Sequence, residues 1–211
     1  MKTLGIFGTS GMAREVGDIA YEVGYSPIYI AQNQVELDAW KFPYDVILET
    51  EVERFKGMDF VIGIGENFIR QRVAKRFAKA IHFCSLIHPS ATFGQGQRKL
   101  VESRSGTIVC AGVRFTNNIQ VGNFDIFNQN VTVAHDVIVE DFVHLAPGSV
   151  ISGNVHVASR CWIGAGAVIN QGSSDTKLRI GTDTIIGSGA IVIAPCDHSA
   201  VYVGVPAKRI K

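Results

Sequence analysis

Apolar residues recur at every sixth position through the second half of the chain. The series runs without a slip through Val109, Phe115, Val121, Phe127, Val133, Val139, Leu145, Ile151, Val157, Ile163 and Ile169. Neither the helical period of about 3.6 residues nor the alternation of a strand gives this spacing. Six-residue units are typical of a triangular coil, in which each unit forms one side and stacked sides bury the same position. The pattern therefore predicts a parallel β-helix built from hexapeptide repeats.

Two segments interrupt this series, and its phase resumes at Ile180 after the second of them. Both segments, Gly94–Gly106 and Gly172–Lys177, are rich in glycine, serine and charged residues. We expect each to loop out at a corner of the coil, because loops on a rigid scaffold often carry function. Helix signals vanish after residue 88, so no helix is expected there. The stretch Val201–Arg209 leaves the period, which predicts a closing hairpin or cap.

The first half of the chain alternates short apolar runs with segments of helical spacing. The expected strands are Leu4–Phe7, Ile28–Ile30, Val46–Leu48 and Phe60–Gly65, and the expected helices are Met12–Gly24 and Phe68–Ala80. Such alternation is typical of a parallel sheet covered by helices. The sequence thus predicts an α/β domain over residues 1–87 and an all-β domain over residues 88–211.

Composition narrows the range of partners. The chain has 211 residues, 46% of them hydrophobic, and its 20 basic and 19 acidic residues give a net charge of +1. This balance provides no basic surface for nucleic acid or for an anionic membrane. The first residues lack a signal-peptide profile, and no apolar run is long enough to span a bilayer. The four cysteines lie far apart, which favours reduced thiols, so we expect a cytoplasmic protein.

A glycine-rich turn, Gly8-Thr9-Ser10-Gly11, connects the first expected strand to the first expected helix. Backbone N–H groups at such a helix N-terminus suit a phosphate or pyrophosphate. The dinucleotide fingerprint requires G-x-G-x-x-G and an acidic residue at the end of the second strand, whereas this chain has G-x-x-G and continues with Ala31-Gln32-Asn33. The turn disfavours a nicotinamide cofactor. It is consistent with a nucleotide or nucleotide-sugar site and with a plain connecting turn.

His135 is the histidine whose surroundings suggest chemistry. It lies two residues after the inward Val133, at an expected corner, and Asp136 follows it. A carboxylate beside an exposed imidazole can fix its tautomer and raise its basicity, as a general base requires. His144 lies nine residues further on, so the two side chains of one chain should point to different places and would meet only across a symmetric oligomer. We expect the remaining histidines to be hydrated surface residues: His82, His88, His156 and His198.

The other residues suggest neither a metal site nor a covalent nucleophile. Histidine spacings of nine and twelve do not match those of zinc-binding β-helices, so no metal is expected. Ser149 and Cys161 occupy inward positions of the repeat and are expected to fill the core. This pattern favours direct attack by an acceptor molecule without an acyl-enzyme.

Short motifs along nearly the whole chain form a consistent set. In the second half they are Ile87–Ala91, Ala134–Asp136, Val143–Gly148, Ile151–Val157, Cys161–Gly166 and Gly204–Lys208. In the first half they are Gly8–Gly11 with Arg14–Val16, and Ile62–Asn67 with Arg70. Together they resemble the sugar O-acyltransferase family of bacterial surface-glycan synthesis. This family includes sialic acid O-acetyltransferases of the NeuD type and PglD-like acetyltransferases that act on nucleotide-linked 4-amino sugars.

The resemblance implies an architecture and an assembly. The first domain would be a Rossmann-like domain that binds a nucleotide sugar, and the second a left-handed parallel β-helix. Three chains would form a homotrimer, with acetyl-CoA in the groove between neighbouring β-helices.

The resemblance also implies roles for individual residues. His135 corresponds to the catalytic base, Asp136 to the acid that raises its basicity, and His144 to a contact with the acetyl-CoA end of the site. The backbone N–H of Gly153 corresponds to the donor to the thioester carbonyl. Positions that line the cofactor are Ala165, Gly187 and Ser188. Positions for the nucleotide-linked substrate are Gly8, Ser10, Gly11, Met12, Gln32, Asn67 and Arg70.

The chain departs from the family pattern in the substrate positions. Family members commonly have histidine where this chain has Met12, and often have two aspartates where it has Ala31 and Gln32. Those aspartates hold the base or ribose, so the identity of the nucleotide stays open. The extra segment Gly172–Lys177 is a further departure.

The sequence thus predicts transfer of acetyl from acetyl-CoA to the amino group of a nucleotide-linked 4-amino-4,6-dideoxy sugar, with His135 as the base. O-acetylation of a sialic-acid-like sugar is an alternative, because the same fold and histidine serve that reaction. A non-enzymatic β-helix scaffold is another, and it predicts no activity that depends on His135.

Overall fold

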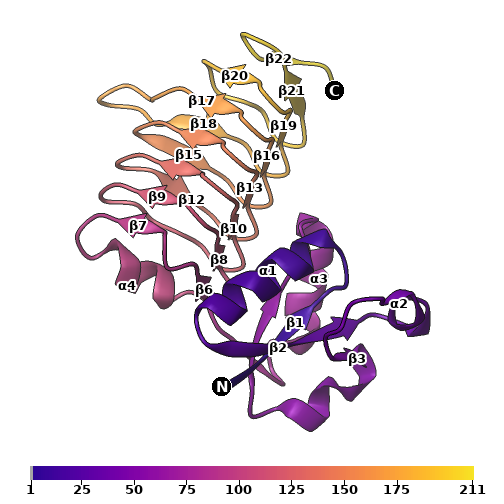
Figure 1. Cartoon of the computed structure of the whole chain (residues 1–211). Helices are drawn as coiled ribbons and strands as arrows, with labels where there is room; N and C mark the ends of the chain where they lie inside the picture. The colour runs from indigo at the N-terminus through magenta and orange to yellow at the C-terminus, as the bar shows by residue number, and fades with distance from the viewer. Residues whose placement is uncertain (1) are drawn as a thin grey trace.

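The computed structural model describes residues 2–211 and has two parts, a sheet covered by helices and a stack of coils (Figure 1). The sheet has parallel strands in the order β3-β2-β1-β4-β5. These strands are β1 (Lys2–Phe7), β2 (Tyr25–Ala31), β3 (Val46–Leu48), β4 (Asp59–Ile62) and β5 (His82–Phe83). The connecting helices are α1 (Gly11–Glu22), α2 (Gln34–Ala39), the 3₁₀ helix Glu49–Phe55 and α3 (Asn67–Phe77).

Helices cover both faces of this sheet because alternate residues of a strand point to opposite faces. Leu4 and Ile6 of β1 pack with the apolar side of α1, whereas Phe7 packs with α3 through Phe77. All three β1 residues are at most 2% exposed. The domain is therefore a doubly wound α/β domain, with the expected strands and helices confirmed to within a few residues.

Two short helices of this domain were not expected from the sequence, nor was the two-residue strand β5. The helices are α2 and the 3₁₀ helix Glu49–Phe55, which follow β2 and β3. Each is too short and too polar to show an apolar period. Both border the pocket described below, so the missed elements matter for function.

The second part is a triangular stack of parallel strands whose three sides form three sheets. Side 1 contains β6 (Leu86–Ile87), β8 (Ile108–Val109), β10 (Ile126–Phe127), β13 (His144–Leu145), β16 (Trp162–Ile163), β19 (Ile185–Ile186), β21 (Val201–Val203) and β22 (Lys208–Arg209). Side 2 contains β7 (Thr92–Phe93), β9 (Arg114–Phe115), β11 (Thr132–Val133), β14 (Val150–Ile151), β17 (Val168–Ile169) and β20 (Ile191–Val192). Side 3 contains β12 (Ile138–Val139), β15 (Val155–Val157) and β18 (Leu178–Ile180).

The six-residue period is the repeat of this stack. Ile126 pairs with His144 and His144 with Trp162, so each coil takes three hexapeptides. Every residue of the apolar series is at most 4% exposed, which confirms that the series points inward. Ser149 and Cys161 are fully buried, as expected of core positions.

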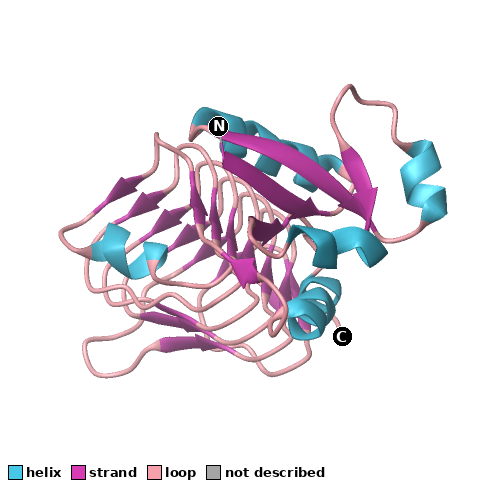
Figure 2. Cartoon of the chain, turned by 90° about the horizontal axis from the view of Figure 1, so that it is seen from below, coloured by secondary structure: helices cyan, strands magenta, loops and turns pink. Residues whose placement is uncertain are grey.

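The two interruptions of the period behave differently. The second loops out between β17 and β18, at the corner of sides 2 and 3, as expected. The first contains α4 (Gln97–Glu102), so the expectation that helices end before residue 88 is wrong there. This helix buries Val101 and packs Leu100 against the core of the coil. It is the short helix beside the stacked strands in Figure 2.

The chain ends in a hairpin, because β21 and β22 pair antiparallel. This confirms the closing element expected over Val201–Arg209. At the other end of the coil, the chain leaves the first sheet at Phe83 and enters side 1 at Leu86. The predicted division at residue 87 stays a prediction. Within residues 2–211 no helix has the length and apolar character needed to cross a membrane.

The N-terminal domain packs against side 1 of the coil. Outward residues of the first coils, Leu86, Ile108 and Ile126, share an apolar cluster with α1. The corner between sides 2 and 3 lies opposite side 1 in the triangle. That corner is therefore turned away from the N-terminal domain.

Candidate active site

His135 lies at the corner between sides 2 and 3, in the turn that connects β11 to β12. Its Nδ1 lies 2.7 Å from Oδ2 of Asp136, and its side chain is 66% exposed. An ionised carboxylate only accepts, so Nδ1–H donates and Nε2 keeps its lone pair. The pair therefore has the geometry of a general base held in one tautomer.

Asp136 is itself held by neighbours on the same corner. Its backbone has a φ of 61°, and its Oδ1 accepts a 2.6 Å hydrogen bond from Asn118. Lys177 donates to its backbone carbonyl and, at 2.8 Å, to Oδ1 of Asn154. The hydrogen bond from His135, that from Asn118 and the charge of Lys177 lower the pKa of Asp136. The carboxylate thus stays ionised and able to stabilise an imidazolium.

Gly153 lies directly beneath the imidazole of His135. A Cβ at this position would come within 2.6 Å of Nε2, so only glycine allows the approach. Gly153 is buried, and its N–H has no acceptor among residues 2–211. A lone N–H beside a base is a suitable donor to an oxyanion.

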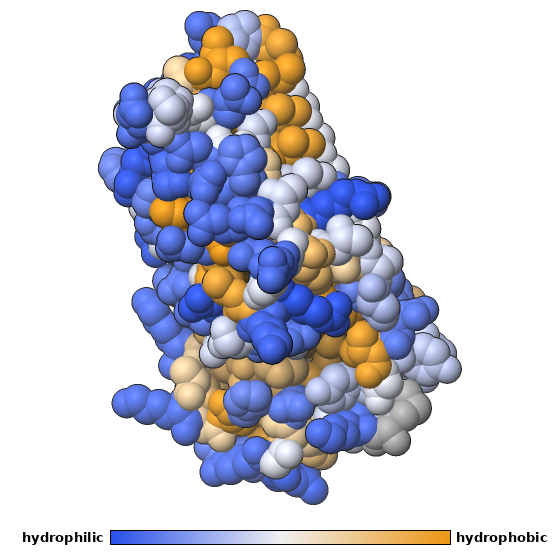
Figure 3. Space-filling view, turned by 90° about the vertical axis from the view of Figure 1, so that its left-hand side faces the viewer, coloured by the Kyte–Doolittle hydropathy of each residue, from blue (hydrophilic) through white to orange (hydrophobic). Residues whose placement is uncertain are grey.

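The expected cofactor positions lie at another corner. Ala165 and Ser188 occupy successive turns between sides 1 and 2, where Gly189 N–H donates to the Ala165 carbonyl at 2.8 Å. Both residues are exposed, and Gly187 is half-buried beside Val203. Apolar residues also gather at this upper end of the coil (Figure 3). On side 1, Ile185 of β19 is 45% exposed. One chain therefore does not bring this corner to His135.

His144 lies in the joint between the two domains. It is 3% exposed and packs on Trp162, with ring centroids 4.2 Å apart. Its Nδ1–H donates to the Gly65 carbonyl at 2.9 Å, and its Nε2 lies 3.3 Å from the Asn128 amide nitrogen. Burial lowers the pKa of His144 to about 4. The ring is therefore neutral near pH 7, and both of its nitrogens have partners within the chain. The acetyl-CoA contact that the resemblance implies stays a prediction.

Asn67 and Arg70 also belong to the joint, and their expected contact with the substrate stays a prediction. Arg70 is fully buried and donates to the carbonyls of Phe124 at 2.7 Å and Phe142 at 2.9 Å on the coil. Asn67 donates to the Cys161 carbonyl at 3.0 Å and accepts from Arg70 at 2.7 Å. Their polar groups are engaged in holding the domains together, so neither lines the pocket.

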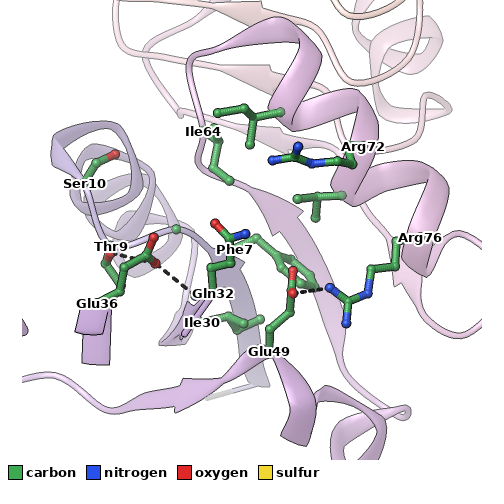
Figure 4. A pocket seen from close by; sticks show the side chains of 13 residues that line it. Phe7, Thr9, Ser10, Ile30, Gln32, Glu36, Glu49, Ile64, Arg72 and Arg76 are labelled. Atoms are coloured by element: carbon green, nitrogen blue, oxygen red, sulfur yellow. Dashed lines mark hydrogen bonds and ion pairs between the residues drawn. The ribbon is translucent and has the colours of Figure 1, made fainter. Parts of the chain in front are cut away.

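A cavity of about 270 Å³ opens at the carboxyl edge of the N-terminal sheet (Figure 4). We call it the N-terminal pocket. It lies next to the boundary between β1 and β4, where the strand order reverses and where open α/β sheets usually bind ligands. Of the expected substrate positions, Gly8, Ser10 and Gln32 line it.

The other two expected substrate positions lie outside the pocket lining. Gly11 is exposed at the start of α1, and Met12 approaches side 1, with its Sδ 4.0 Å from the Asn128 amide nitrogen. Met12 therefore faces the joint that contains His144.

Several polar residues of the pocket were missed by sequence reasoning: Thr9, Glu36, Glu49, Arg72 and Arg76. Glu49 directly follows β3, and a polar residue at the carboxyl end of a parallel strand is a sequence signal of a ligand site. Arg72 and Arg76 are four residues apart and thus share a face of α3. Burial raises the pKa of Glu49, although its ion pair with Arg76 opposes this shift.

The N-terminal region matches a known domain family. Residues 3–77 match the PglD N-terminal domain. Over the whole chain, the protein is 28% identical to GDP-perosamine N-acetyltransferase of Escherichia coli O157:H7, and the match covers 100% of this chain and 97% of that protein.

Solved structures are similar over both domains. PerB from Caulobacter crescentus, crystallised with CoA and GDP-perosamine, is 26% identical, with a TM-score of 0.85 and coverage of 100% of this chain and 98% of PerB. WeeI from Acinetobacter baumannii AYE is 25% identical, with a TM-score of 0.85 and full coverage of both chains. These similarities confirm the predicted fold class, a Rossmann-like domain followed by a left-handed parallel β-helix.

Proposed function

We propose that this protein, which belongs to the PglD-like sugar acyltransferases, transfers acetyl from acetyl-CoA to the amino group of a nucleotide-linked 4-amino-4,6-dideoxy sugar. One observation carries the proposal: the imidazole of His135, with Nδ1 held by Asp136 and Nε2 without a partner, lies against Gly153, whose N–H has no acceptor among residues 2–211. This arrangement offers a base and an oxyanion donor side by side. The full-length similarity to enzymes of this reaction class supports it.

The chemistry requires only these two groups, because a thioester is already activated. The amine nitrogen attacks the carbonyl carbon of acetyl-CoA while Nε2 of His135 takes its proton. The N–H of Gly153 stabilises the negative oxygen of the tetrahedral intermediate. The C–S bond then breaks, and the CoA sulfur leaves and is protonated. A correctly positioned general base increases the reaction rate by about 10²–10⁴-fold, and an oxyanion donor increases it by about 10²–10³-fold.

We place the complete site between neighbouring subunits of a homotrimer. In one chain the His135 corner faces away from both the N-terminal pocket and the Ala165–Ser188 corner. Cyclic symmetry repeats both surfaces in every subunit, so His135 of one subunit can face the other groups on the next. The exposed apolar residues Ile185 and Val203 supply contact area beside the cofactor corner. Since both substrates are cytoplasmic metabolites, we assign the enzyme to the cytoplasm.

A substrate screen tests the proposed reaction. The purified protein would be incubated with acetyl-CoA and with GDP-, UDP- or dTDP-linked amino sugars, and the release of free thiol measured. We expect thiol release with an amino sugar and none when a hydroxyl replaces the amine. Release with the hydroxyl sugar alone would favour O-acetylation. His135→Ala should abolish turnover without changing the oligomeric state measured by light scattering, whereas retained turnover would remove His135 from the mechanism.

A further inference from the structure

The N-terminal pocket contains a pattern of charged groups that discriminates between nucleobases. We propose that the pocket binds a guanine base, and that the pair Glu49 and Arg76 recognises the edge of that base. The inference rests on the proposed function, because it assumes that this pocket receives the nucleotide part of the substrate. It assigns the nucleotide that the sequence left open.

The walls of the pocket suit a flat aromatic ring. Apolar side chains line it from the sheet and from α3: Phe7, Ile30, Ile64, Ile69 and Val73. Figure 4 shows Ile30 and Ile64 on different sides of the opening. A base placed between such walls buries both of its faces, which is favourable in water.

Glu49 provides the acceptor in this apolar setting. Its side chain is 8% exposed, and Oε2 forms an ion pair with Arg76. Oε1 has no donor among the residues that the structure describes, and Figure 4 shows the carboxylate directed toward the cavity. Oε1 is not among the fully buried atoms of the described residues, so its lone pairs are open to a donor from a ligand in the cavity.

The order of acceptors and donors matches guanine. Its Watson–Crick edge presents the O6 acceptor, then N1–H, then the 2-amino group. A carboxylate can accept from two adjacent N–H groups, as Glu49 would, because each oxygen has two lone pairs. Arg76 has remaining N–H groups beside that carboxylate that can donate to O6. Uracil and thymine have a single N–H flanked by carbonyls, so one carboxylate oxygen would face a carbonyl oxygen; adenine lacks the second adjacent donor.

Other groups of the pocket suit the rest of a nucleoside diphosphate. Ser10 precedes α1, whose first N–H groups favour phosphate oxygens, and Arg72 points into the opening in Figure 4. Glu36 accepts from the Gln32 N–H at 2.9 Å and the Thr9 hydroxyl at 3.3 Å at the end of β2. A carboxylate at this place is suited to ribose hydroxyls, which all nucleotides share. Glu36 is thus a matched control for Glu49.

Calorimetric titration of the full-length protein with nucleoside diphosphates tests this assignment. We expect GDP to bind more tightly than UDP, dTDP and ADP. Inosine diphosphate lacks only the 2-amino group, so it should bind about 10-fold more weakly than GDP, as for loss of one charge-assisted hydrogen bond. Glu49→Gln should weaken GDP binding by about 10- to 100-fold and remove the preference over inosine diphosphate. Glu36→Gln should weaken all the diphosphates by a similar factor.

The outcomes separate this inference from the proposed function. Tighter binding of UDP or dTDP, or a Glu49→Gln variant that keeps the preference for GDP over inosine diphosphate, would overturn the guanine assignment and leave the acetyl transfer intact. Failure of every diphosphate to bind would overturn both. The comparison of GDP with inosine diphosphate uses the unaltered protein, so it decides the question even if Glu49→Gln does not fold.

Discussion

Two histidines nine residues apart in the same coil occupy contrasting environments. His135 lies at an open corner and is 66% exposed at its side chain, whereas His144 lies under the N-terminal domain and is 3% exposed. Both use Nδ1 for a hydrogen bond, His135 to the carboxylate of Asp136 and His144 to the carbonyl of Gly65. A carboxylate stabilises an imidazolium, while a buried site with a carbonyl partner does not compensate for desolvation.

The contrast shows that the hexapeptide repeat places a side chain but does not give it a role. Both histidines point out of the coil, and what lies over that part of the coil decides the chemistry. The corner of His135 can exchange a proton with a substrate. The joint around His144 holds two domains in register. Each substitution below changes one region and leaves the other unchanged, and the expected effects decrease from the first to the last.

Replacing Arg70 should disrupt the joint most strongly. Arg70→Met would leave buried carbonyls of Phe124 and Phe142 without their donor and Asp125 without its neighbouring positive charge. We expect a loss of about 3–5 kcal/mol in the free energy of unfolding, the usual range when one partner of a buried ionic network is removed. Chemical denaturation measures this loss. Arg72→Met, at an exposed position of the same helix, should cost less than about 1 kcal/mol, and equal losses for both variants would contradict the account.

Gly153→Ala should damage the His135 corner without affecting the joint. The added methyl group would occupy the place of the imidazole ring, which can swing away because its far end is exposed. We expect kcat to fall about 100-fold, as for a displacement of about 1 Å, with the melting temperature nearly unchanged. Steady-state kinetics with Ser152→Ala as the neighbouring control measures this effect. Normal kcat in Gly153→Ala would show that the approach of His135 to Gly153 is not needed.

The stability of the joint should depend on pH through His144. Because burial lowers its pKa to about 4 from the ordinary 6.5, the unfolded chain binds more protons between these pH values. The stability that neutral His144 contributes is fully present above pH 6.5. The free energy of unfolding then falls with the pH, by about 2 kcal/mol at pH 5. Asp125 opposes this trend, since burial raises its pKa. The quantity to measure is therefore the difference in unfolding free energy between wild type and His144→Gln from pH 7 to pH 5. A constant difference would contradict the neutral, buried state of His144.

Replacing Lys177 should change kcat least, because Lys177 holds the turn that contains Asp136 and does not contact the substrate. Lys177→Met would remove the donor to the Asp136 carbonyl and to Asn154. We expect kcat to fall by about 3- to 10-fold with little change in the KM for acetyl-CoA, a loss comparable to one hydrogen bond. Lys177→Arg should recover part of the rate. If both variants have wild-type kcat, the segment Gly172–Lys177 does not support the His135–Asp136 pair.

The sequence predicts the features that the six-residue period determines. It does not predict the positions that depend on contacts between the two domains. The coil, its inward residues and the corner position of His135 all follow from six-residue spacing, and the structure agrees. Arg70 and His144 could not be placed in the joint, because nothing local indicates which surface the N-terminal domain covers. Glu49 carries a local signal, its place directly after the expected strand Val46–Leu48, but its partners in the pocket come from α3 and β2, far away in the sequence. The predicted roles of the site residues themselves stay predictions.

The central claim is that His135 takes the proton of the acceptor amine, whereas His144 only supports the joint. Its most direct test compares His135→Gln and His144→Gln in acetyl-CoA-dependent single-turnover rates and in unfolding free energy. We predict that His135→Gln lowers the rate by about 10²–10⁴-fold with unchanged stability. His144→Gln should keep a rate within about 10-fold of wild type and lose about 1–2 kcal/mol of stability. The reverse pattern, a slow His144 variant and an active His135 variant, would contradict the account.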